Sequence, residues 1–206
     1  PYIEEWEEAG TFPIEIYKKA ADVGILGIGY PEEYGGTPGD IFYRVAVSEE
    51  LMRSGSGGFC AGLGSFNIAI PPILSLGTDA QKKKYIPPVL AGEKIAALAI
   101  TEPGGGSDVA NLTTTALKDG DHYIINGSKT FITSGNRADF ITCAVRTGDP
   151  GAKGVSLIII DADTPGYSAA NKLKKTGWWA SDTAEIFFDN CRVPAENLLG
   201  GENQGV

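Results

Sequence analysis

The chain has 206 residues, of which 42% are hydrophobic and 21% are charged, and this balance is typical of a globular protein. It carries 26 acidic and 17 basic residues, and this net charge of −9 argues against a general binder of nucleic-acid phosphates. The three cysteines are far apart and form no Cys-x-x-Cys pair, so neither a disulfide framework nor a zinc site is supported. A single histidine leaves little basis for a metal site or a histidine-activated nucleophile.

The ends and the hydropathy of the chain bear on its location. It has no run of 18 apolar residues and no signal-peptide pattern, so we expect no membrane span. Because the chain begins at Pro1 and its one methionine is Met52, we interpret it as a fragment or a trimmed chain. Reduced cysteines are compatible with a bacterial cytoplasm or a mitochondrial matrix.

Helical periodicity dominates the first 94 residues. Apolar side chains recur at helical spacing over residues 13–26, and glycines and a proline then stop the pattern. Asp40 is placed to cap a second helix that runs through Met52.

Two proline pairs shape the next predicted helices. Residues 66–76 are apolar on nearly every face, which predicts a buried helix that Pro71-Pro72 must start late or kink. Thr78 and Gln81 form a capping box at the start of a following short helix. We expect Pro87-Pro88 to close that helix.

From about residue 95 the pattern changes to short runs rich in β-branched and aromatic residues, separated by turn signals. Asp119-Gly120 and Asn126-Gly127 are expected to form two-residue hairpin turns, because both positions of a type I′ turn need positive φ. Many short strands without intervening helices predict an antiparallel barrel or sandwich. The predicted strands are Ile95–Ile100, Leu112–Leu117, Tyr123–Ile125, Lys129–Thr133, Phe140–Val145, Val155–Ile160 and Ala184–Phe188.

The predicted fold class is therefore α+β and multidomain. A helical amino-terminal domain spans residues 1–94, and an antiparallel β-barrel domain spans residues 95–206.

Three weak signals do not survive their context. Gly27-Ile-Gly29 runs into a proline and opens no dinucleotide-binding helix, and Gly127-Ser-Lys129-Thr130 lacks the upstream glycine of a phosphate-binding loop. His122 lies beside a predicted hairpin turn, where a solvated role is expected rather than a catalytic one.

The segment Ala99-Ile-Thr-Glu-Pro-Gly-Gly-Gly-Ser-Asp108 follows a predicted strand. Its glycines allow backbone N–H groups to approach a ligand closely, and Thr101 and Ser107 supply hydroxyls on either side. We interpret it as a candidate site for a diphosphate or a ring carbonyl. The alternative is a glycine-rich strand connection.

A second segment, Asn126-Gly-Ser-Lys-Thr-Phe-Ile-Thr-Ser-Gly135, lies farther along the chain. Strand alternation places Phe131 and Thr133 on one face and Ile132 on the other. An aromatic ring and a hydroxyl two residues apart suit a flat heteroaromatic ligand. The alternative is a core phenylalanine and a surface threonine.

Both segments, in this order, resemble the acyl-CoA dehydrogenase family through a Thr-Glu-Pro-Gly-x-Gly-Ser-Asp signature followed by Asn-Gly-x-Lys-x-aromatic-Ile-Thr. Residues 181–189 and 192–200 are similar to the last strand and exit of the family's middle domain. Residues 34–36, 77–81 and 91–92 are similar to its helical amino-terminal domain. The resemblance covers essentially the whole chain.

The resemblance implies an oxidoreductase of fatty acid β-oxidation, a flavoprotein that uses FAD for the α,β-dehydrogenation of acyl-CoA thioesters. It implies electron-transfer flavoprotein as the electron acceptor and a homotetramer as the assembly. It assigns Ser107 to the substrate as well as to FAD, and expects residues 59–67 to help line the acyl pocket. The implied cofactor-binding residues are Leu98, Ile100, Thr101, Gly106, Ser107, Phe131, Ile132 and Thr133.

The resemblance also implies roles that this chain does not fill. The family's catalytic glutamate lies in a third, helical domain, so no catalytic residue and no metal ligand is assigned here, and the chain alone is expected to be inactive. Glu102 is expected to hold its turn rather than act as the base. Phe131 stands where many members have tryptophan, and Asn111 where a small residue is usual. An acyl-CoA oxidase and a non-catalytic binding module remain as alternatives.

Overall fold

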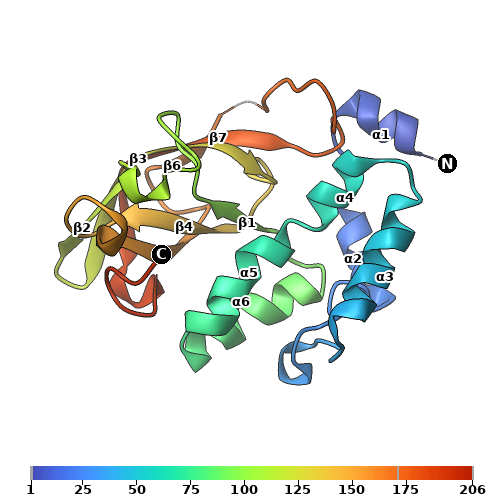
Figure 1. The fold of residues 1–206 in the computed structure, drawn as a ribbon, viewed down its shortest axis with the longest axis horizontal. Helices are drawn as coiled ribbons and strands as arrows, with labels where there is room; N and C mark the ends of the chain where they lie inside the picture. The colour runs from blue at the N-terminus through green and yellow to red at the C-terminus, as the bar shows by residue number, and fades with distance from the viewer. Residues whose placement is uncertain (1, 171, 206) are drawn as a thin grey trace.

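The computed structural model describes residues 2–170 and 172–205, and it divides into a helical layer and a sheet (Figure 1). Helices follow one another as far as Leu90, and the first strand begins at Ala96. The predicted order of a helical part followed by a mostly antiparallel sheet is confirmed. The helices are α1 (Ile3–Ala9), α2 (Glu15–Asp22), α3 (Ile41–Met52), α4 (Gly57–Leu63), α5 (Phe66–Leu76) and α6 (Asp79–Leu90).

Local side-chain caps start two of these helices where the sequence predicts them. The Asp40 carboxylate accepts a hydrogen bond of 2.9 Å from the Phe42 amide at the start of α3. At α6, Gln81 N–H donates to the Thr78 hydroxyl at 3.2 Å, and Thr78 N–H donates to the Gln81 side chain at 2.8 Å. Both caps satisfy amides that the helix itself leaves free.

The prolines lie inside their helices, and the prediction that Pro87-Pro88 closes α6 is wrong. The helix continues to Leu90, and the Pro87 carbonyl still accepts a hydrogen bond from the Ala91 amide at 2.9 Å. In α5, Pro71-Pro72 neither delays the start at Phe66 nor divides the helix. A proline costs about 3 kcal/mol in a helix interior. Burial of neighbouring apolar residues offsets that cost, since Ile70, Ile73 and Ile86 are fully buried.

One sheet of eight strands follows the helices, in the order β6-β7-β3-β2-β4-β5-β8 with β1 beside β4. Most pairs are antiparallel, whereas β4 pairs in parallel with β1 and, at one residue, with β2. The strands are β1 (Ala96–Ala99), β2 (Thr115–Asp119), β3 (His122–Thr133), β4 (Phe140–Arg146), β5 (Val155–Asp161), β6 (Tyr167–Ala169), β7 (Thr183–Pro194) and β8 (Leu198–Leu199).

Both faces of β4 are buried, which explains its nearly continuous apolar sequence. Phe140 and Ala144 belong to a core shared with the helices, whereas Ile141 and Val145 belong to a second core inside the sheet. Residues from β1, β2, β3, β4, β5 and β7 meet in that second core, so the sheet curls around it.

The predicted strands 123–125 and 129–133 form one long strand, β3, and the predicted hairpin turn at Asn126-Gly127 is wrong. The pairing of β3 with β7 continues on both sides with a register shift there, which makes this dipeptide a β-bulge. A Cβ on Gly127 would lie 2.7 Å from Thr114 Cα, so the bulge requires glycine. The other predicted hairpin is present, but its turn lies one residue farther along: Asp119 pairs with His122, so Gly120 and Asp121 form the turn, and of these two only Gly120 has a positive φ, of 61°. The prediction of Asp119-Gly120 as the two turn residues, both with positive φ, is therefore wrong. The short strands β6 and β8 were not predicted.

The segment Gly57–Leu76 meets the length and composition of a membrane span, with a mean hydropathy of 1.5, which is weak evidence for one. In the structure it forms two helices, α4 and α5, interrupted at Gly64 and Ser65. Helix α5 packs against β1, β4 and α6. Of the apolar window, 44% is buried, so packing against these elements explains part of the apolar composition.

Candidate functional site

The two motif segments singled out in the sequence lie side by side where β1 ends and β3 passes it. The Thr130 amide donates to the Thr101 carbonyl at 2.9 Å. The Thr101 hydroxyl donates in return to the Thr130 carbonyl. Two hydrogen bonds therefore hold Thr101 of the first motif beside Thr130 of the second, although 29 positions separate them in the chain.

A closed turn carries the glycines of the first motif. The amides of Glu102 and Gly105 each donate to the other's carbonyl at 3.0 Å. Residues 103–108 are exposed, and a Cβ at Gly104 or Gly105 would contact nothing within 4 Å. The turn therefore presents open backbone, and the Ser107 hydroxyl stands at the same surface.

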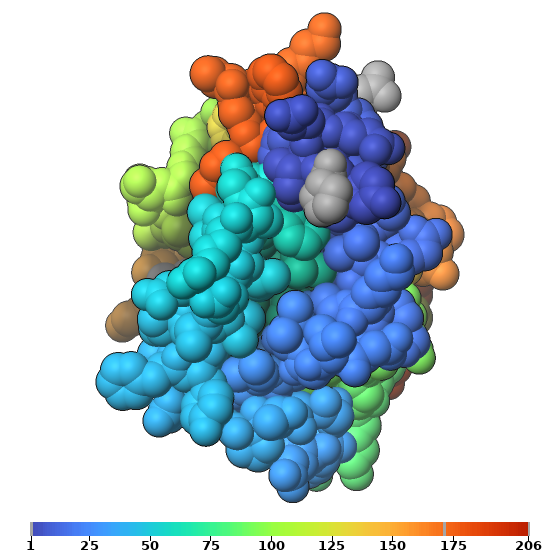
Figure 2. Space-filling view, turned by 90° about the vertical axis from the view of Figure 1, so that its right-hand side faces the viewer, coloured from blue at the N-terminus to red at the C-terminus, as the bar shows by residue number. Residues whose placement is uncertain are grey.

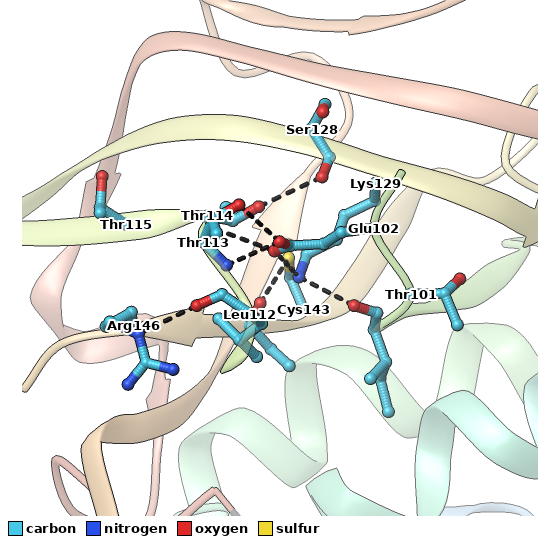
Figure 3. Close-up of polar contacts among 12 residues, drawn as sticks. Thr101, Glu102, Leu112, Thr113, Thr114, Thr115, Ser128, Lys129, Cys143 and Arg146 are labelled. Carbon is cyan, nitrogen blue, oxygen red and sulfur yellow. Dashed lines mark hydrogen bonds and ion pairs between the residues drawn. The ribbon is translucent and has the colours of Figure 1, made fainter. Parts of the chain in front are cut away.

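Beneath the turn lies a buried ion pair between Glu102 and Lys129 (Figure 3), 2.8 Å apart. The Lys129 ammonium also donates to the Ile100 carbonyl at 3.0 Å. Glu102 accepts further hydrogen bonds from the Thr113 amide (2.6 Å), the Thr113 hydroxyl (2.7 Å) and the Thr114 amide (2.9 Å).

These contacts decide the ionisation of Glu102. Burial acts to raise the pKa of this carboxyl, but the hydrogen bonds from Lys129, Thr114 and Thr113 outweigh it and lower the pKa to about 2. A carboxylate with saturated oxygens and so low a pKa is a poor general base at neutral pH. The geometry agrees with the expectation that Glu102 holds its turn.

Phe131 is turned out of the sheet at the end of β3. Its φ is 57°, in the left-handed region that costs an ordinary residue about 1–2 kcal/mol, and its side chain is 69% exposed. A register shift between Lys129 and Ile132 places it there. The alternative of a core phenylalanine is therefore wrong. A strained backbone that exposes a large aromatic ring is a feature found at ligand sites.

The other residues implied as cofactor contacts differ in how far their side chains are available. Thr133 is half-buried and pairs with Thr183, and Gly106 is exposed in the turn. Leu98 and Ile100 are half-buried against the core shared with the helices. Ile132 is buried in the sheet core, so only its backbone is available to a ligand.

A cavity of about 470 Å³ opens in the helical part, in the recess between the blue and cyan segments of Figure 2. It lies between α3 and α4 and is mostly apolar. Six residues of the 59–67 segment line it: Cys60, Ala61, Leu63, Gly64, Phe66 and Asn67. Trp178 reaches it from the segment before β7, and the absence of a side chain at Gly57 makes room for the indole.

The remaining signals from the sequence have structural explanations. His122 lies at the hairpin, where its Nδ1 is 2.5 Å from an Asp121 oxygen. Lys129 is fully buried and is not free to hold a phosphate. Among the described residues, no group of three or more His, Cys, Asp or Glu side chains is placed to hold a metal.

Sequence reasoning missed three parts of the site. The partnership of Lys129 with Glu102 was not predicted, because Ser128 and Thr130 flank the lysine and nothing in this polar stretch indicates that it is buried. Trp178 was missed because it lies in an irregular segment, where no helix or strand periodicity predicts the direction of a side chain. Its backbone has a positive φ of 57°. Arg146 was also missed: it donates to the carbonyls of Ala110 (2.6 Å), Leu112 (2.9 Å) and Asp149 (2.8 Å), and so fixes the segment after the turn.

Comparison with known proteins identifies the protein family of this chain. Residues 1–93 match the family model "Acyl-CoA dehydrogenase, N-terminal domain", and residues 97–191 match "Acyl-CoA dehydrogenase, middle domain". The chain belongs to the acyl-CoA dehydrogenase family. It is 40% identical over 206 residues to the mitochondrial isobutyryl-CoA dehydrogenase of Dictyostelium discoideum, covering all of this chain and 49% of that protein.

Solved structures of acyl-CoA dehydrogenases share the same fold. A probable acyl-CoA dehydrogenase from Mycobacterium abscessus is 52% identical with a TM-score of 0.97, and the match covers all of this chain and 55% of that one. An acyl-CoA dehydrogenase from Bacillus anthracis, solved in complex with FAD, is 36% identical with a TM-score of 0.90, over all of this chain and 35% of that one. The present acyl-CoA dehydrogenase chain thus spans about half the length of the curated relatives it matches.

Proposed function

We propose that the protein containing this chain is an FAD-dependent enzyme that introduces an α,β double bond into acyl-CoA thioesters. The observation that carries the proposal is the joining of the two motif segments through Thr101 and Thr130 beside an exposed Phe131. We place the boundary between an amino-terminal helical domain and a middle β domain at residues 94 and 95, between α6 and β1.

The residues where the two motif segments meet fit the isoalloxazine ring and the diphosphate of FAD. Phe131 offers an exposed aromatic face for stacking, and in this proposal the hydroxyl of the half-buried Thr133 donates toward the flavin N5. The strand end Leu98–Thr101 offers backbone groups to the pyrimidine edge, and the turn at Gly106 and Ser107 offers its own to the diphosphate. When bound, FAD supplies the acceptor for the substrate hydride. A hydrogen-bond donor near N5 stabilises the charge that the ring gains.

The substrate occupies the adjacent helical part in this proposal. The acyl chain enters the cavity between α3 and α4, where the apolar lining removes it from water. The Ser107 hydroxyl, exposed beside the turn, contacts the CoA arm as well as FAD.

The base that removes the α-proton is proposed to lie in the remainder of the enzyme. Glu102 lies in the first motif segment, but its oxygens already accept four hydrogen bonds, so we do not assign it as the base. The relatives are about twice as long as this chain, which leaves room for a domain that supplies the base. Residues 1–206 alone are accordingly proposed to be inactive.

Electron-transfer flavoprotein is the proposed acceptor, and a homotetramer the proposed assembly. A chain in the solved structure of the electron transferring flavoprotein of Acidaminococcus fermentans is 38% identical with a TM-score of 0.94, and this similarity supports electron-transfer flavoprotein as the partner. An oxidase is the second candidate, because the prolyl acyl carrier protein oxidase AnaB is 35% identical with a TM-score of 0.87. Mitochondrial and bacterial relatives support either compartment.

Purification of the full-length protein tests the proposal. We expect a yellow protein with flavin absorption bands that bleach when acyl-CoA is added without oxygen. Fast recovery of the bands in air would identify an oxidase, and recovery only with electron-transfer flavoprotein a dehydrogenase. A colourless protein that gains no flavin bands with added FAD would instead favour a non-catalytic binding module.

A further inference from the structure

The ammonium group of Lys129 connects β3 to the residues on either side of Thr101. Lys129 lies on β3 and is fully buried, and its Nζ donates both to the Ile100 carbonyl (3.0 Å) and to the Glu102 carboxylate (2.8 Å). These acceptors belong to the residues on either side of Thr101. The lysine therefore holds Thr101 from both sides without contacting its side chain.

The carboxylate extends this connection to a third segment. Glu102 accepts hydrogen bonds from the amides of Thr113 and Thr114, at the entry to β2. Both of its oxygens are used, and the two side chains of the pair are almost completely buried. The contacts thus tie the end of β1, the glycine turn, the start of β2 and β3 together at one point (Figure 3).

We propose that Lys129 and Glu102 are positioning residues that hold Thr101 and the 104–107 turn in the geometry that binds FAD. This inference rests on the proposed function. Burial of two charges is not in itself a source of stability, since an apolar pair of similar volume is often as good. Here the hydrogen bonds of the pair restrict the conformation of the end of β1 and of the glycine turn. Without these bonds, the glycines would leave both segments free to move.

Lys129→Met tests the proposal, because it removes the charge and both hydrogen bonds while keeping a side chain of similar length. FAD affinity is measured by titration of the full-length apoprotein, at a temperature where circular dichroism shows each variant folded. We expect the Kd to rise about tenfold or more, as for loss of hydrogen bonds to a charged group. Asn197→Ala is the control: it removes a different buried hydrogen bond, from Asn197 to the Ile159 carbonyl (2.9 Å), and should leave the Kd within about twofold.

A double variant separates positioning from a general loss of stability. If Lys129 and Glu102 position the FAD site as one unit, then Glu102→Gln adds little to the loss already caused by Lys129→Met. Independent, multiplying losses would contradict the inference, and so would an unchanged Kd in folded Lys129→Met. If Lys129→Met does not fold, Glu102→Gln alone is measured in its place. Its NH₂ group faces the Thr113 and Thr114 donors where an acceptor is needed, so its Kd for FAD should also rise.

Hydrogen exchange of the apoprotein tests positioning without any ligand. In the Lys129→Met protein, the amides of Glu102, Gly105 and Thr130 should exchange faster relative to the amides of β5. Unchanged protection at these three amides would overturn the inference. Absence of FAD binding by the wild-type protein would instead overturn the proposed function, and the exchange experiment distinguishes the two failures.

Discussion

The guanidinium of Arg137 lies over the ring of Phe12, with Cζ 4.6 Å from the ring centroid. The same guanidinium donates to the Thr11 hydroxyl at 2.9 Å and to the Phe12 carbonyl at 3.1 Å. One side chain from the loop after β3 thus attaches the segment between α1 and α2 to the sheet.

Replacing this side chain should loosen the attachment of the helices. We expect Arg137→Ala to lower the free energy of unfolding by about 1–3 kcal/mol, because it removes hydrogen bonds from a charged donor and a cation–π contact. Urea unfolding measures the change. Arg192→Ala is the matched control: Arg192 forms an exposed ion pair with Asp119, so its loss should cost no more than about 1 kcal/mol. Equal losses in the two variants would contradict the proposed importance of Arg137.

The bulge in β3 should not tolerate a side chain. Gly127 has a φ of 143°, and an added Cβ would lie 2.7 Å from Thr114 Cα. We expect Gly127→Ala to destabilise the protein by about 1–3 kcal/mol in thermal or urea unfolding. Gly104→Ala, where a Cβ meets open space, should change stability by less than about 1 kcal/mol. Its effect should appear instead in FAD affinity.

Acid should weaken the fold through Glu102. The folded-state pKa of about 2 lies below the ordinary value of 4.5, so the stability that Glu102 contributes is complete above pH 4.5 and is lost as the pH falls toward 2. The double variant Glu102→Gln/Lys129→Met lacks this group and should lose less stability over that window, by urea unfolding. Burial raises the pKa of Asp182, whose effect has the opposite sign, but both proteins share it. Parallel pH profiles would show that Glu102 makes no such contribution.

Thr133→Ala should weaken flavin binding or slow flavin reduction in the full-length enzyme. A neutral hydrogen bond contributes about 0.5–1.5 kcal/mol net, so the loss should be roughly tenfold at most. Titration with FAD and anaerobic stopped-flow reduction measure the two effects. Thr133→Ser keeps the hydroxyl and should retain most of the affinity. If Thr133→Ala matches the wild type in spectrum, affinity and rate, the proposed role at N5 is wrong.

Residues 1–206 alone should not bleach added flavin with acyl-CoA at an enzymatic rate. The loss of a positioned general base costs about 10²–10⁴-fold. FAD and a panel of acyl-CoAs are added to the purified chain without oxygen, and the flavin band is followed. Bleaching at about 1 s⁻¹ or faster would place the base within this chain.

The sequence by itself determined the features that depend on a few neighbouring residues. The change from helices to strands near residue 95 and the caps at Asp40 and Thr78 follow from local chemistry. So does the existence of a hairpin at Gly120, although its turn lies one residue beyond the predicted Asp119-Gly120. The two motif segments also identified the family before any contact between them was known.

Only the tertiary structure decided features in which distant segments compete with local preference. Burial of Ile73 and Ile86 keeps proline pairs inside helices, and pairing with β7 turns Asn126-Gly127 into a bulge. The strained exposure of Phe131 and the burial of Lys129 against Glu102 arise in the same way. Such contacts join residues far apart in the chain, and their free energy exceeds the local propensities of about 1–3 kcal/mol that the sequence displays.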